Sequence, residues 1–126
     1  MTDRLRTCAL WKDPEATVAR GLQAQFELLE TFARDSHWWR YLLKCRDCGQ
    51  LYVMDFHETV DWEGGEDPQF TTWVPVATDD EIAAAKAAPP GALGSFTPRL
   101  CKDWPKGQDR PSLYWVRPGT GGNAVA

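Results

Sequence analysis

Cysteine is the residue type in this sequence whose spacing most clearly predicts chemistry. Cys45 and Cys48 form a Cys-x-x-Cys pair that is followed directly by Gly49. Two thiolates at this spacing can bind one metal ion, and glycine accepts the positive φ that such a tight corner often needs. We therefore predict a structural zinc site at this corner, with Cys8 and Cys101 completing a set of four sulfur ligands.

Other interpretations of these cysteines stay open. His37 or His57 could replace a missing sulfur, but a strand would carry His57 roughly 30 Å from the corner. The four cysteines could also be reduced, partly buried thiols that bind no metal. A redox-active pair fits less well, because thioredoxin-like enzymes place Cys-x-x-Cys at the start of a helix, whereas the residues after Cys48 resemble a strand.

The segments on either side of the corner predict a β-hairpin. Residues 40–44 and 50–56 are rich in the aromatic and branched side chains that favour strands. A further strand is predicted at residues 70–76, where Phe70, Thr72, Val74 and Val76 alternate with Thr71 and Trp73 after a Gly-Gly loop. Residues 100–101 and 112–117 have the composition of two more short strands.

Two helices are predicted around these strands. Asp13-Pro14-Glu15 has the composition of a helix start, and apolar residues then recur every three or four positions, which indicates a long amphipathic helix over residues 14–34. Thr78 and Glu81 have capping-box spacing before a short helix that ends at Pro89-Pro90-Gly91. The sequence thus predicts one α+β domain over residues 1–117, with a small, mainly antiparallel sheet, and a disordered Gly-rich tail at 118–126.

Charge is distributed unevenly along the chain. Residues 47–85 contain ten acidic residues and no Lys or Arg, which gives −10, whereas residues 1–46 carry +2 and residues 86–126 carry +4. The acidic segment also contains Trp62 and Trp73. Acidic and aromatic side chains together favour binding of a basic protein, and we expect this surface to consist of Asp61, Trp62, Glu63, Glu66, Asp67 and Trp73.

The sequence offers little support for catalysis. Asp55, His57, Glu58 and Asp61 have the chemistry of acid-base groups, but on a strand Asp55 and His57 share one face and Glu58 lies on the other. We find no nucleophile elbow, phosphate-binding glycine loop, metalloprotease helix or dinucleotide-binding fingerprint. We therefore predict a protein that is not an enzyme.

The N-terminal residues and the lengths of the apolar runs indicate the cellular compartment of the protein. The start, MTDRLRTCALWKD, is charged throughout, unlike a signal peptide, and no later run resembles a membrane span. We expect a cytoplasmic protein, in which cysteines stay reduced or bind metal.

The run HWWRYLLKCRDCGQLYVMDFHETVDWEGGEDPQFTTWVPV, with PRLCKDWP and LYWV further along, resembles small acidic cytoplasmic bacterial proteins, among them immunity proteins of polymorphic toxin systems. This resemblance implies a non-catalytic protein that neutralises a basic toxin domain. Cys45, Cys48 and Gly49 resemble half of a zinc ribbon, which gives the alternative of an accessory protein for nucleic acid or a transcription assembly. That alternative would use the basic residues Arg99, Lys102, Lys106, Arg110 and Arg117.

Overall fold

The protein is built around one six-stranded antiparallel sheet. In the computed structural model, the described residues are 3–60, 62–65 and 67–117, and the predicted tail at 118–126 lies outside them. The strands are β1 (Phe26–Arg34), β2 (Trp38–Cys45), β3 (Leu51–Glu58), β4 (Gln69–Val76), β5 (Arg99–Trp104) and β6 (Ser112–Val116). The helices are α1 (Asp3–Thr7), α2 (Ala9–Lys12), α3 (Pro14–Ala19), α4 (Leu22–Gln25), α5 (Asp79–Ala87) and the 3₁₀ helix η1 (Ala92–Ser95).

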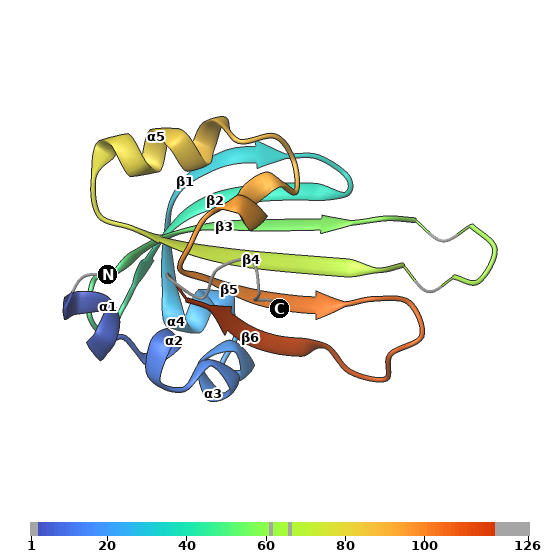
Figure 1. The fold of residues 1–126 in the computed structure, drawn as a ribbon, viewed down its shortest axis with the longest axis horizontal. Helices are drawn as coiled ribbons and strands as arrows, with labels where there is room; N and C mark the ends of the chain where they lie inside the picture. Colours follow the sequence, from blue (N-terminus) through green and yellow to red (C-terminus); the bar gives the residue numbers. More distant parts are fainter. Residues whose placement is uncertain (1–2, 61, 66, 118–126) are drawn as a thin grey trace.

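The strands pair in sequence order, from β1 at one edge to β6 at the other (Figure 1). The predicted hairpin is confirmed: β2 and β3 pair with Lys44 opposite Leu51 and Trp38 opposite His57, on either side of the Cys-x-x-Cys-Gly corner. The strand predicted at residues 70–76 is β4, and the two short C-terminal strands are β5 and β6. The α+β class and the antiparallel sheet are therefore correct.

The long amphipathic helix predicted over residues 14–34 is wrong. The chain instead forms two short helices, α3 and α4, and then the edge strand β1. Gly21 separates the two helices with a φ of +95°, which a helix cannot continue through. Beyond Gln25, pairing with β2 replaces helical hydrogen bonds, and most of β1 is exposed. The apolar spacing suited a helix, but tertiary pairing decided the outcome.

Helices cover both faces of the sheet. Helices α1–α4 lie against one face, and α5 with η1 lies against the other (Figure 1). Strand alternation sends Leu43, Tyr52, Met54, Trp73 and Leu100 to a core with α1–α4, which also buries Cys8 and Cys45. The intervening residues Leu42, Val53, Val74 and Val76 pack with Ala85 and Leu93 in a second core. The faces predicted for residues 70–76 agree with this division.

Helix α5 begins with the predicted capping box. Thr78 accepts a hydrogen bond from the Glu81 backbone N–H at 3.2 Å, and the Glu81 carboxylate accepts one from the Thr78 N–H at 3.2 Å. Both bonds satisfy groups that the first helical turn leaves without intrahelical partners. None of the described helices combines the length and apolar character that crossing a membrane requires.

Candidate metal centre

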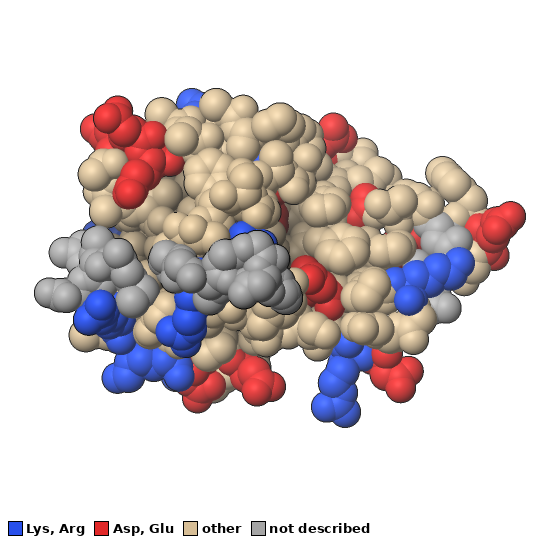
Figure 2. All heavy atoms as spheres, in the orientation of Figure 1, with Lys and Arg blue, Asp and Glu red and all other residues tan. Residues whose placement is uncertain are grey.

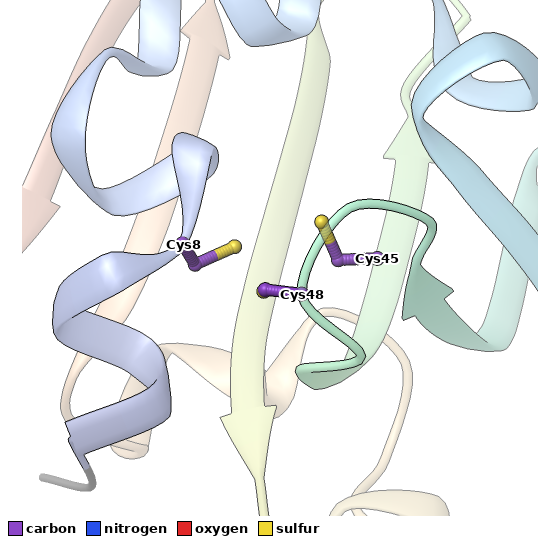
Figure 3. Close-up of side chains that lie close together, drawn as sticks. All are labelled: Cys8, Cys45 and Cys48. Atoms are coloured by element: carbon purple, nitrogen blue, oxygen red, sulfur yellow. The ribbon is translucent and has the colours of Figure 1, made fainter.

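Three of the four cysteines meet in one place. The sulfur atoms of Cys8, Cys45 and Cys48 all lie within 4.8 Å of one another. Cys8 comes from the junction of α1 and α2, whereas Cys45 is the last residue of β2 and Cys48 lies in the turn that follows it (Figure 3). The cluster thus joins the N-terminal helices to the corner of the β2–β3 hairpin, two segments far apart in the sequence.

The corner has the backbone geometry that the Cys-x-x-Cys-Gly sequence predicts. Gly49 has a φ of +82°, in the region that favours glycine. Its N–H donates to the Cys45 carbonyl at 2.9 Å, and the Cys45 N–H donates to the carbonyl of Gln50 at 2.8 Å. The turn therefore brings Cys48 back over Cys45.

Hydrogen bonds around Cys45 favour its thiolate. Burial acts to raise the pKa of Cys45, but the backbone N–H of Cys48, the Gln25 side chain and the backbone N–H of Asp47 stabilise negative charge, and the pKa falls below its ordinary value. Gln25 donates from Nε2 to Cys45 Sγ at 3.3 Å and to the Asp47 carboxylate at 3.1 Å. Cys45 is thus prepared to act as an anionic ligand.

Cys8 behaves differently. Burial raises the pKa of its thiol to about 12, although the Tyr52 hydroxyl, which donates to Cys8 Sγ at 3.0 Å, acts in the opposite direction. Burial and the neighbouring Cys8 also raise the pKa of Tyr52. Cys8 is therefore a neutral thiol unless a cation stabilises its charge, and a coordinated metal ion does this for a thiol ligand.

The three sulfurs suit a tetrahedral, thiophilic ion. Zinc–sulfur bonds of about 2.3 Å in a tetrahedron place sulfur atoms roughly 3.8 Å apart, within the spread of this group. The described residues supply three ligands of the usual four. Cys48 is the least buried of the three, and Tyr52 and Gln25 form an outer layer of hydrogen-bond donors to the sulfurs.

Cys101 does not belong to this group, so the predicted set of four sulfurs is not assembled. Cys101 pairs with Thr72 and Tyr114 in the sheet, and its neighbour Leu100 shares the core of Cys8 and Cys45. Because side chains alternate along a strand, Cys101 lies on the opposite face. Burial raises the pKa of its thiol.

The two histidines also lie apart from the sulfurs. His37 Nδ1 lies 3.0 Å from a Glu58 carboxylate oxygen, and the His57 ring stacks on Phe70 with 5.3 Å between centroids. Neither is among the described ligand atoms that cluster with the cysteines.

The predicted partner-binding residues divide into two groups. Trp62, in the loop between β3 and β4, is 90% exposed, and Glu63 beside it is also exposed. Asp67 is half-buried in the same loop, whereas Asp61 and Glu66 lie outside the described residues. Trp73 is only 5% exposed, because alternation turns it into the core, so its assignment to a partner-binding surface is wrong.

The sequence analysis missed a buried ion pair on the other face. Arg40 and Asp55 lie opposite each other on β2 and β3, are 1% and 2% exposed in their side chains, and are joined at 3.1 Å between Nε and Oδ1. Arg40 also donates to backbone carbonyls at the end of α5, and Asp55 accepts from Trp38 Nε1 and the Gly91 N–H. The predicted hairpin contained the signal: once Lys44 is placed opposite Leu51, the same antiparallel register places Arg40 opposite Asp55.

Comparison with known proteins adds no family to these observations. The chain matches no family model, no curated protein and no solved structure. The candidate site therefore stands on the geometry of its own residues.

Proposed function

We propose that this protein is a non-catalytic binding protein, of the immunity type, which neutralises a basic toxin domain through the loop between β3 and β4. The observation that carries this proposal is Trp62, whose side chain is 90% exposed. Tryptophan is among the residues that most often supply the binding energy of a protein interface, because it buries a large apolar area with little loss of side-chain entropy.

Backbone hydrogen bonds fix both ends of the loop between β3 and β4. Strands β3 and β4 pair over their full length, from Leu51 opposite Val76 to Glu58 opposite Gln69. Beyond them the Thr59 N–H donates to the carbonyl of Pro68 at 3.1 Å. A partner would therefore meet a loop whose two ends are fixed, which lowers the entropic cost of binding.

Acidic charge supports a basic partner at this loop. Within the acidic segment, Asp55 is paired with buried Arg40, Glu58 with His37, and Asp47 lies 3.8 Å from Arg20. The other described acids of this segment are Glu63 and Asp67, which place negative charge in the loop itself, and Asp79, Asp80 and Glu81, which lie at the start of α5. Acidic groups accordingly appear at both ends of the molecule in Figure 2. Trp62 lies in the same loop as Glu63 and Asp67, between β3 and β4.

The binding proposal is tested by measuring how this protein binds a purified basic toxin domain. Trp62→Ala should weaken the complex by about 2 kcal/mol, or roughly thirtyfold, if Trp62 is the anchor. Glu63→Lys with Asp67→Lys should slow association most at low salt, because complementary charge steers encounter.

The matched control makes the same charge change on edge strand β1, with Glu27→Lys and Glu30→Lys, both exposed positions. The control should associate with the toxin domain at nearly the wild-type rate, and therefore much faster than the loop variant. Unchanged affinity in Trp62→Ala, measured by calorimetry, would reject the loop as the binding surface.

We further propose that the three-cysteine cluster binds zinc as a structural centre. Its support is the convergence of Cys8, Cys45 and Cys48 and the hydrogen bonds that stabilise a thiolate at Cys45. Elemental analysis should find about one zinc per chain, and a chelator should increase the number of freely titrating thiols. Metal-free protein with the same thermal stability as zinc-treated protein would contradict it. All four cysteines are free of disulfides, in accord with a cytoplasmic location.

A further inference from the structure

An open cavity of about 460 Å³ lies between α3–α4 and the sheet, away from the cysteine cluster's sulfurs and from the β3–β4 loop tip. Its volume falls in the range of small-molecule sites. Val18 and Leu22 contribute from the helices, and aromatic side chains of β2, β3 and β4 contribute from the sheet. Such walls suit a flat apolar ligand better than a charged peptide.

One row of side chains crosses the floor of this cavity. Trp39 lies opposite Phe56, Phe56 opposite Thr71, and Thr71 opposite Lys102, so the row runs from β2 to β5. The Trp39 and Phe56 rings stack, with centroids 4.6 Å apart and planes 17° from parallel. The row therefore has an aromatic end and a cationic end.

Lys102 supplies the positive charge at the cationic end of this row. It is the charged residue among the described residues that line the cavity, and it is half-buried. No described acidic residue forms an ion pair with it. A cation in this position, beside apolar walls, favours an anionic ligand.

Trp73 contributes its ring to the wall of the cavity near the same end. Its side chain lines the cavity and is 5% exposed, yet its Nε1 is buried and has no acceptor among the described residues. Because solvent does not reach Nε1, Trp73 contributes apolar ring surface to the cavity, and this N–H does not contact a ligand there. Trp73 lies diagonally across from Lys102, because Thr71 pairs with Lys102 and Trp73 pairs with Leu100.

We propose that this cavity binds a small aromatic carboxylate. The ring system packs against Trp39 and Phe56, and the carboxylate accepts from Lys102 Nζ. Phe56 and Lys102 are two strand spacings apart, or about 10 Å, which matches a ligand of one or two fused rings with its carboxylate at one end. This ligand site is separate from the proposed toxin-binding loop, and each stands without the other.

The test measures binding of 2-naphthoate by calorimetry, with 2-naphthamide as its uncharged counterpart and decanoate as a non-aromatic carboxylate. The wild-type protein should bind 2-naphthoate about tenfold or more tightly than either of the other two compounds. Absence of 2-naphthoate binding, or equal affinity for the amide, would overturn the proposal. Equal affinity for decanoate would overturn the aromatic specificity.

Variants locate the site. Lys102→Met keeps the length of the side chain and should abolish the preference for naphthoate over naphthamide. Lys44→Met removes a charge from an exposed position on the opposite face of β2 and should leave that preference unchanged. A preference that survives Lys102→Met, or that Lys44→Met also abolishes, would contradict the assignment.

Discussion

The two faces of the sheet bury polar groups in opposite ways. On the α5 face, Arg40 is surrounded by acceptors: the Asp55 carboxylate and the backbone carbonyls that end α5. On the α1–α4 face, Trp73 Nε1 has no acceptor among the described residues, and three cysteine sulfurs converge, two of which accept side-chain hydrogen bonds from Tyr52 and Gln25. The hydrogen-bonded Arg40–Asp55 network stabilises the fold by itself. The three sulfurs, in contrast, form the place where we propose that a bound metal ion increases the free energy of unfolding.

The largest effect should come from breaking the satisfied network. Arg40→Met leaves the Asp55 carboxylate buried without its cation and removes the donors to the last carbonyls of α5. We expect the free energy of unfolding in urea to fall by about 3–5 kcal/mol. The double variant Arg40→Met/Asp55→Leu should recover much of that loss, because it removes the unpaired charge. A loss under about 1 kcal/mol for the single variant would show that the ion pair does not anchor α5.

Removing one sulfur from the other face should have the next largest effect. Cys45→Ser in zinc-loaded protein should lower the free energy of unfolding by about 3 kcal/mol, since the bound ion stabilises only the folded chain. Cys101→Ser is the matched control, because Cys101 is also buried but lies on the opposite face. Its stability should not depend on added zinc. Equal zinc dependence in both variants would contradict the three-cysteine site.

A smaller effect is expected at the corner that holds Cys48. Gly49→Ala places a side chain at a φ of +82° and should cost about 1–2 kcal/mol in thermal unfolding measurements. Gly94→Ala is a suitable comparison, because Gly94 has no positive φ and a Cβ there meets nothing within 4 Å. If the corner positions a metal ligand, Gly49→Ala should also weaken zinc binding, and Gly94→Ala should not.

The smallest effect should come from the cap of α5. Thr78→Ala removes the acceptor for the Glu81 N–H and should cost about 1 kcal/mol in urea unfolding, with no change in zinc content. Thr78→Ser keeps the acceptor and should retain most of the stability. A loss of several kcal/mol in Thr78→Ala would mean that the cap, rather than Arg40, dominates the α5 face.

Local signals predicted much of this fold. The hairpin follows from branched and aromatic residues on either side of a Cys-Gly corner, and the α5 capping box follows from Thr78 and Glu81. Residues 14–34 were mispredicted because apolar spacing in Phe26, Leu29 and Phe32 also suits a helix. The edge pairing with β2 is a long-range interaction that periodicity does not contain.

The sequence by itself determined the corner at Cys45, Cys48 and Gly49, because those residues are close along the chain and the turn needs a glycine φ. Only the tertiary structure decided that Cys8 joins them and Cys101 does not, that Trp73 is buried while Trp62 is exposed, and that Lys102 faces a cavity. The physical reason is alternation along paired strands. The pairing register between neighbouring strands fixes the face of the sheet on which each side chain lies. That register depends on contacts between strands that are far apart in the sequence.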